Sequence, residues 1–217
     1  MIDALLKTLG ERFPLTEQPV GEFAALKANG MKFTVRAFEA NGLGHVSVMQ
    51  AKGFFGLMRM DTLIVNPVQK DLPLYSYDRI FMMGRDVLIT ELYDTMIEPR
   101  AFDALEAVKA DYREIPDSPD VEAHWYDSIK LKESIRKAGK KKASAKFDEL
   151  TKRHFAAYLD AAPEENCDPA AKREKASVYV EGLLQNGGPS TDVFMKKLGR
   201  EKTEALFRTV LFGTADK

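Results

Sequence analysis

Five segments between residues 32 and 93 have the apolar pattern and the length of β-strands. They are residues 32–38, 46–50, 62–65, 75–82 and 87–93. Gly, Asn, Asp or Pro bounds each of them, as is typical of strands joined by turns. The connections have the length of hairpins, which predicts that successive strands run antiparallel. Because these strands are apolar at both odd and even positions, the sheet requires cover on both faces.

Helical periodicity flanks the strands on both sides. It covers residues 1–13, 102–110, 143–160, 169–186 and 190–212, with Gly199 separating two helices in the last segment. Strands followed by helices are typical of the α+β class. The chain of 217 residues is long enough for one real core. We therefore predict a single domain, residues 1–217, built as a three-layer α/β/α sandwich around one central antiparallel sheet.

Composition excludes several classes of protein. The one cysteine, Cys167, excludes an internal disulfide framework and a metal site made of cysteines alone. The net charge of −1 gives the chain no overall bias toward nucleic acid. No apolar run is long enough to span a membrane, and the N-terminus lacks the apolar core of a signal peptide. We expect a cytoplasmic monomer with no nucleic-acid or membrane partner.

Motifs for common cofactors are missing from the sequence. It contains no Walker loop, no GxGxxG fingerprint, no HExxH and no GxSxG. The three histidines, His45, His124 and His154, are too scattered to predict a zinc site, and we interpret them as structural or surface residues. The motifs alone therefore indicate no more than a soluble α+β domain.

The charge distribution is strongly uneven. Residues 130–153 hold ten Lys or Arg and three acids, a balance of +7, so the remainder carries −8. One interpretation is a solvated helix start with a flexible lysine loop. The other is a docking face for an acidic partner, because complementary charge speeds the formation of transient complexes. Arg136 follows the apolar Ile135 and fits an inward-facing position beside an anionic ligand group.

Four segments in order resemble the ferredoxin-dependent bilin reductases. They are residues 66–78, which begin Asn-Pro and contain Leu-Pro-Leu-Tyr, residues 87–94, the His-Trp-Tyr-Asp-Ser turn at 124–128, and residues 190–212. The resemblance implies an α/β/α fold and the reduction of biliverdin, a linear tetrapyrrole, by successive one-electron transfers. It also implies reduced ferredoxin as electron donor and no bound flavin, nicotinamide or metal.

The resemblance assigns roles to individual residues. Asp78 matches the proton-donating aspartate, although an Asp at a strand end also suits a turn hydrogen bond. Asn186 falls near a catalytic Asn or Asp, or is simply the last residue of a helix before Gly187. Arg136 matches a propionate-binding arginine at the end of a strand that starts near Ser128. The lysines expected to dock ferredoxin are Lys137, Lys140, Lys141 and Lys142.

The sequence departs from the members that form phycocyanobilin at two positions. Thr62 occupies the place of a His, and Met49, followed by Gln50, occupies the place of a Glu. We assign these three residues and Asn66 to substrate binding. The predicted function is reduction of biliverdin or a related bilin. The alternatives are a protein that binds or delivers a tetrapyrrole without reducing it, and an enzyme like red chlorophyll catabolite reductase.

Overall fold

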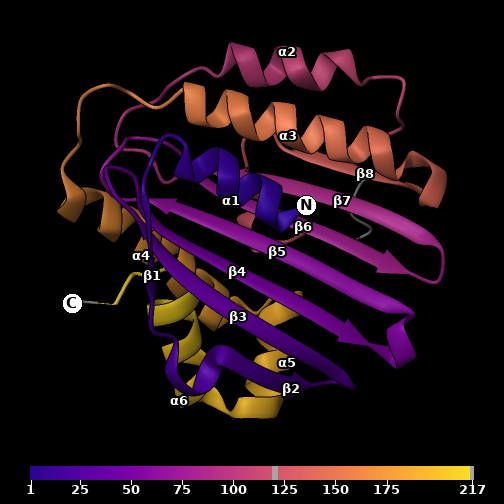
Figure 1. The fold of residues 1–217 in the computed structure, drawn as a ribbon. Helices are drawn as coiled ribbons and strands as arrows, with labels where there is room; N and C mark the ends of the chain where they lie inside the picture. The colour runs from indigo at the N-terminus through magenta and orange to yellow at the C-terminus, as the bar shows by residue number, and fades with distance from the viewer. Residues whose placement is uncertain (119–121, 216–217) are drawn as a thin grey trace.

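An antiparallel sheet forms the centre of the protein (Figure 1). The computed structural model describes residues 1–118 and 122–215. The strand order is β1-β3-β4-β5-β6-β7-β8, and β2 also pairs with β3. The strands are β1 (Leu15–Gln18), β2 (Ala25–Ala28), β3 (Met31–Ala40), β4 (Gly44–Gly53), β5 (Met58–Pro67), β6 (Leu74–Met82), β7 (Arg85–Tyr93) and β8 (Ile135–Lys140). The five predicted strands lie within β3 to β7, and their antiparallel pairing is confirmed.

Helices lie on both sides of this sheet (Figure 1). One side carries α1 (Ile2–Gly10), α2 (Asp103–Asp111) and α3 (Ser144–Asp160). The other side carries α4 (Pro169–Asn186), α5 (Pro189–Leu198), α6 (Arg200–Ala205) and the π-helical segment η5 (Leu206–Leu211). Each predicted helix is present, and Gly199 separates α5 from α6 as expected. The α+β class is confirmed.

Alternation along the strands divides the interior into two cores. In β4, Val46 and Val48 belong to the core beneath α1 and α3. Met49 and Ala51 point the other way, into the core beneath α4 to η5. Side chains of adjacent residues leave a strand on opposite faces. The apolar residues at both odd and even positions therefore fill both cores.

Two strands and one strand boundary were not foreseen from the sequence. β1 and β2 are four residues long and largely exposed, so neither has an apolar pattern. The segment from Ser128 to Arg136, expected as a strand ending at Arg136, begins instead as a 3₁₀ turn, η3 (Trp125–Ile129). The strand β8 starts at Ile135 and pairs with β7, so Arg136 lies near its beginning. The lysines mask this strand because they break the apolar alternation.

Trp125 fixes η3 against α4. An added Cβ at Gly182 would overlap Cη2 of Trp125, so the indole packs directly on the glycine. The indole Nε1 donates a hydrogen bond to the carbonyl of Gly187 at 3.4 Å. The Trp125 side chain thereby holds the turn that also carries His124 and Tyr126.

Among the described residues, no helix combines the length and apolarity needed to cross a membrane.

We expect Gly182→Ala to destabilise the protein, although alanine is normally the better helix former. The gain in helix propensity is at most about 1 kcal/mol. The clash with Trp125 is an overpacking defect that costs about 1–3 kcal/mol. Urea unfolding should show a net loss of stability. In the background Trp125→Leu, where the ring is gone, the same substitution should cost less; an equal loss in both backgrounds would contradict the contact.

Candidate active site

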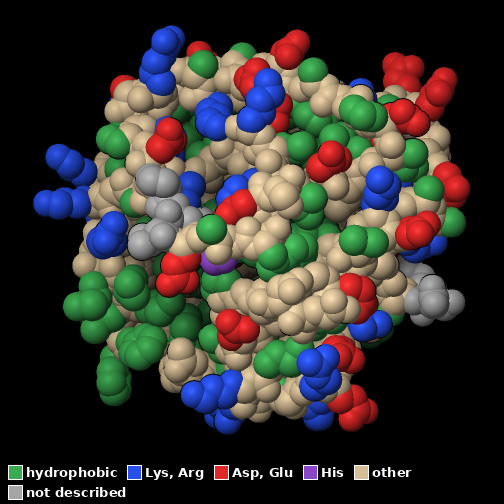
Figure 2. Space-filling view, turned by 180° about the vertical axis from the view of Figure 1, so that it is seen from behind, with side chains coloured by type: hydrophobic (Ala, Val, Ile, Leu, Met, Phe, Trp, Pro, Cys, Tyr) green, Lys and Arg blue, Asp and Glu red, His purple; other side chains and the backbone are tan. Residues whose placement is uncertain are grey.

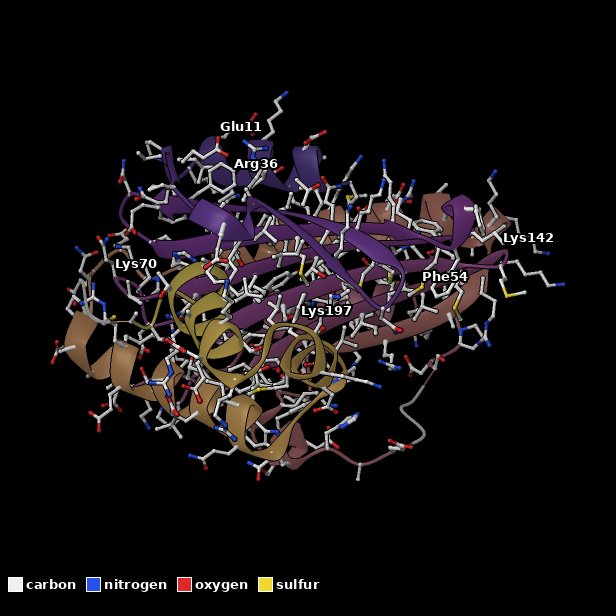
Figure 3. The ribbon with its side chains drawn as sticks, turned by 90° about the horizontal axis from the view of Figure 1, so that it is seen from below. Glu11, Arg36, Phe54, Lys70, Lys142 and Lys197 are labelled. Carbon is white, nitrogen blue, oxygen red and sulfur yellow. The ribbon has the colours of Figure 1, made fainter. Side chains whose placement is uncertain are left out.

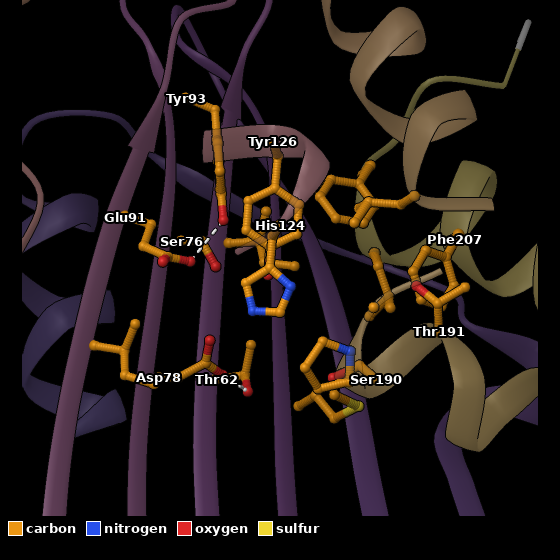
Figure 4. A pocket seen from close by; sticks show the side chains of 18 of the residues that line it. Thr62, Ser76, Asp78, Glu91, Tyr93, His124, Tyr126, Ser190, Thr191 and Phe207 are labelled. Atoms are coloured by element: carbon orange, nitrogen blue, oxygen red, sulfur yellow. Dashed lines mark hydrogen bonds between the residues drawn. The ribbon is translucent and has the colours of Figure 1, made fainter. Parts of the chain in front are cut away.

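A cavity of about 350 Å³ lies between the sheet and the helices α4, α5 and η5 (Figure 4). This volume falls within the range of small-molecule sites. Its floor is the face of the sheet that carries Met49, Thr62, Asp78 and Arg136. Its other walls come from η3 and from the C-terminal helices, with Leu211 and Phe212 among the lining residues. The cavity thus joins segments far apart in the sequence.

The pairing register places the floor residues in one row across five strands. Met49 lies opposite Thr62, Thr62 opposite Asp78, Asp78 opposite Ile89, and Ile89 opposite Arg136. Directly opposed residues share a face of the sheet. Arg136 is two strands from Asp78, which corresponds to about 10 Å at the usual strand spacing. A carboxyl group and a guanidinium therefore face the same cavity from backbone positions about 10 Å apart.

The carboxyl group of Asp78 is half-buried and has an unusual proton affinity. Burial raises its pKa to about 6, and the negative charge of Glu91 acts in the same direction. Two groups oppose this rise in pKa: Thr62, whose hydroxyl donates to Oδ1 of Asp78 at 2.5 Å, and the positive charge of Arg136. Asp78 therefore exchanges a proton near neutral pH, which an ordinary surface aspartate does not.

Glu91 and a group of aromatic rings form the wall beside Asp78. The Tyr93 hydroxyl donates to Glu91 at 2.5 Å, and Lys130 Nζ lies 3.6 Å from the same carboxylate. Tyr93 stacks on Tyr179 with a centroid distance of 4.4 Å. These contacts hold Glu91 in place on the same face of the sheet as Asp78.

His124 enters the cavity from η3. Its ring stacks on Tyr126 with a centroid distance of 4.9 Å, and Figure 4 shows both rings projecting toward the strands that carry Asp78 and Thr62. We interpreted this histidine from the sequence as structural or surface, so its place in the cavity was missed. The sequence feature that could have indicated His124 is the His-Trp-Tyr-Asp-Ser turn at 124–128. The position of this turn in the chain does not show that it lies beside the strands. Glu91 was also missed, although it is a charged residue in an otherwise apolar strand.

A comparison with solved structures matches phytochromobilin synthase from tomato, crystallised in complex with biliverdin. The TM-score is 0.76 at 14% sequence identity, and the match covers 100% of this chain and 84% of that chain. The chain has the fold of phytochromobilin synthase. The resemblance to the ferredoxin-dependent bilin reductases is thus confirmed in the fold. No family model and no curated protein matches the sequence.

Four of the residues predicted for the site line the cavity: Met49, Thr62, Asp78 and Arg136. Gln50 does not, because it follows Met49 in β4 and so leaves the strand on the opposite face. There its amide donates to Asp61 at 2.9 Å. This placement does not support the predicted contact of Gln50 with a ligand in the cavity.

Asn186 also lies outside the lining of the cavity. It is the exposed last residue of α4, and its amide donates to the carbonyl of Gly182 at 3.1 Å. The alternative interpretation from the sequence, a residue that ends a helix before a glycine turn, describes this geometry. The placement does not support a catalytic role.

Asn66 anchors the wall of the cavity rather than lining it. The side chain is buried, and its Nδ2 donates to the carbonyl of Phe212 at 2.7 Å. On the neighbouring strand, Ser47 donates to the carbonyl of Leu211 at 2.7 Å, and His45 Nε2 is 2.8 Å from the carbonyl of Val210. Three successive carbonyls at the end of η5 are thus bound to the sheet, which positions Leu211 and Phe212 in the cavity.

The basic segment, residues 130–153, is partly buried. Lys137 was expected at a docking surface, but its side chain is buried on the face opposite the cavity. Its Nζ donates to the carbonyl of Ile115 at 2.6 Å and pairs with Asp117 at 2.8 Å. Alternation in β8 directs Lys137 inward, and this buried placement does not support its predicted docking role. Lys140, Lys141 and Lys142 are exposed at the end of the strand.

Replacing Asn66 by Asp should destabilise the protein, because a carboxylate cannot donate to the carbonyl of Phe212. Leaving that buried acceptor unpaired costs about 1–3 kcal/mol. Urea unfolding measures the loss, and Asn41→Asp at an exposed turn is the matched control. If both variants unfold alike, Asn66 does not anchor the C-terminal segment.

Asp78→Asn should stabilise the protein, and the gain should grow with pH. The pKa of Asp78 in the folded protein, about 6, exceeds the ordinary 3.8, so folding disfavours the charged form. The wild type therefore loses stability as pH rises from about 4 to about 6, whereas the neutral amide does not. We expect the difference in unfolding free energy between the two to change by on the order of 2 kcal/mol between about pH 4 and about pH 7, and to level off above that. A difference independent of pH would contradict the raised pKa.

Proposed function

We propose that this protein reduces biliverdin or a related linear tetrapyrrole with electrons from reduced ferredoxin. The observation that carries the proposal is a carboxyl group with a pKa of about 6, Asp78, set in one row with Arg136 on the floor of the cavity. The fold that holds this row is also that of a synthase crystallised with biliverdin. Helices packed on both faces of the sheet support the three-layer α/β/α arrangement.

Asp78 is the proton donor in this proposal. Reduction of one double bond takes two electrons and two protons, and the site of protonation decides which bond is reduced. A pKa near 6 suits proton transfer close to neutral pH. A tetrapyrrole lying over the carboxyl group excludes water from it, which favours the protonated form further. The Thr62 hydroxyl donates to Oδ1 of Asp78. The other carboxyl oxygen of Asp78, Oδ2, faces the ligand in this proposal.

Arg136 and the aromatic wall bind the ligand in this proposal. A guanidinium binds a carboxylate with two parallel hydrogen bonds, as a propionate group requires. The rings of His124 and Tyr126 offer flat surfaces for conjugated pyrrole rings. Met49, beside Thr62 in the row, gives an adaptable apolar contact.

An anaerobic absorbance experiment tests the proposal. The protein is mixed with biliverdin, and reduced ferredoxin is then added. We expect a red-region shift on mixing and a time-dependent loss of that band after the electron donor is added. Asp78→Asn should keep the shift on mixing and lower turnover by about 100-fold or more. Arg136→Gln should weaken binding about tenfold, since it removes a charge-assisted contact.

Matched controls separate these roles from general damage. Asp3→Asn and Arg173→Gln change exposed residues of α1 and α4, away from the cavity, and should leave binding and turnover unchanged. A coloured complex that ferredoxin does not alter would show a binding or delivery protein instead. That outcome has a motivation in the sequence, because Thr62 and Met49 stand where phycocyanobilin-forming enzymes carry His and Glu. No spectral change on mixing would contradict both functions.

A further inference from the structure

Two neighbouring hairpins expose apolar side chains at one end of the sheet. The β4–β5 turn presents Phe54, Phe55 and Leu57, and the β6–β7 turn presents Met82 and Met83. Phe55 is fully exposed and Met83 is 80% exposed. Figure 2 shows hydrophobic side chains gathered at one edge of the molecule, close to several Lys and Arg. Monomeric proteins seldom leave so many large apolar groups together in water without a partner.

The two turns form one continuous surface. Met58 lies opposite Met82 in the β5–β6 pairing, and the amide of Met83 donates to the carbonyl of Leu57 at 3.2 Å. Phe54, Phe55 and Met83 have positive φ angles of 52°, 56° and 49°. L-residues other than Asn and Asp seldom adopt this conformation. The backbone therefore holds large apolar groups at projecting positions where Gly or Asn is the usual residue.

Cations surround these tips. The exposed cations in and next to the turns are Lys52, Arg59, Arg85, Lys140, Lys141 and Lys142. Arg85 lies opposite Lys140 in the β7–β8 pairing, which places the end of β8 beside the β6–β7 turn. Figure 3 shows Lys142 and Phe54 toward the same end of the molecule, with Lys197 apart from them.

Acidic residues are missing from the same stretches. Residues 51–60, 79–85 and 138–143 contain no Asp or Glu. The acids that follow the first two stretches, Asp61 and Asp86, are buried. Asp61 accepts from Gln50 and lies 3.9 Å from Arg59. Asp86 accepts from Arg79. The local surface is thus apolar at its tips and positively charged around them.

We propose that these hairpin tips attach the protein to the surface of an anionic lipid bilayer. Lysine and arginine attract the negative leaflet, and apolar side chains enter the boundary between headgroups and acyl chains. That boundary is about 5–10 Å deep, which matches two or three residues at the end of a strand. An acidic protein would also attract the lysines, but it would leave the projecting tips unexplained, because stable protein interfaces are broad patches.

Attachment of this kind needs no spanning helix, so it revises the expectation that the chain has no membrane partner. Met60 and Ile80 line the cavity, and each lies two residues along its strand from Met58 and Met82, on the same face. An apolar path along β5 and β6 thus joins the tips to the cavity. The attachment itself is independent of the reaction proposed above.

Sedimentation of the full chain with lipid vesicles tests the proposal. Vesicles of phosphatidylcholine containing phosphatidylglycerol are compared with vesicles of phosphatidylcholine alone. We expect binding to the anionic vesicles that weakens with added salt. Lys140→Gln/Lys141→Gln/Lys142→Gln should lower the partition coefficient about 100-fold. Phe54→Asn/Phe55→Asn should lower it about 100-fold as well, since two phenyl rings no longer enter the bilayer.

Matched variants keep the test specific. Lys196→Gln/Lys197→Gln/Lys202→Gln removes the same charge from α5 and α6, and Val178→Ser removes an exposed apolar residue of α4. Neither should alter binding to vesicles. Phe54→Asn/Phe55→Asn should not lower the melting temperature, because Asn tolerates positive φ.

Four outcomes would overturn the proposal. The first is no binding to anionic vesicles, and the second is equal binding to both kinds of vesicle. The third is a concentration-dependent dimer that Phe54→Asn/Phe55→Asn abolishes, which would make a second copy of the chain the occupant. The fourth is salt-sensitive association with ferredoxin that needs the three lysines but not the phenylalanines, in a protein that binds no vesicles. That result would assign the lysines to an acidic protein.

Discussion

The central strands β5, β6 and β7 are buried on both faces, so every polar side chain that they carry needs a partner. On one face, Arg79 of β6 donates to Asp86 of β7, with one contact at 2.7 Å, and Ser144 at the start of α3 donates to the same carboxylate. On the other face, Thr62 donates to Asp78, and Tyr93 donates to Glu91. The two faces differ in the charge of the groups that donate to the buried carboxyl groups.

On the face beneath α3, opposite charges meet directly and neutralise each other. On the face beneath α4, Asp78 accepts a hydrogen bond from the neutral hydroxyl of Thr62. Burial raises the pKa of this carboxyl group to about 6. The same strands therefore make a structural ion pair on one side and a proton-exchanging site on the other.

The sequence predicted the parts of the fold that alternation and helical periodicity determine. The strands from β3 to β7 and all the helices follow from those patterns, whereas β8 does not, because Lys137 and Lys140 break its apolar alternation. For the site, alternation places Met49 and Gln50 on opposite faces of β4, so only one of the two can face the cavity. Asp78 and Arg136 lie in one row because of the pairing register across β6, β7 and β8. The sequence does not show this register, because β8 has no apolar alternation from which to predict it.

The placement of His124 and Asn66 depends on tertiary contacts that no local pattern encodes. His124 reaches the cavity because Trp125 packs on Gly182 of α4, more than fifty residues later in the chain. Asn66 does not line the cavity, because the C-terminal segment covers it and accepts a hydrogen bond from its amide. Both contacts link the sheet, or the turn beside it, to the last third of the chain. The cavity therefore exists only when the C-terminal helices have docked, and its wall is as rigid as the hydrogen bonds that hold Val210, Leu211 and Phe212 to the sheet.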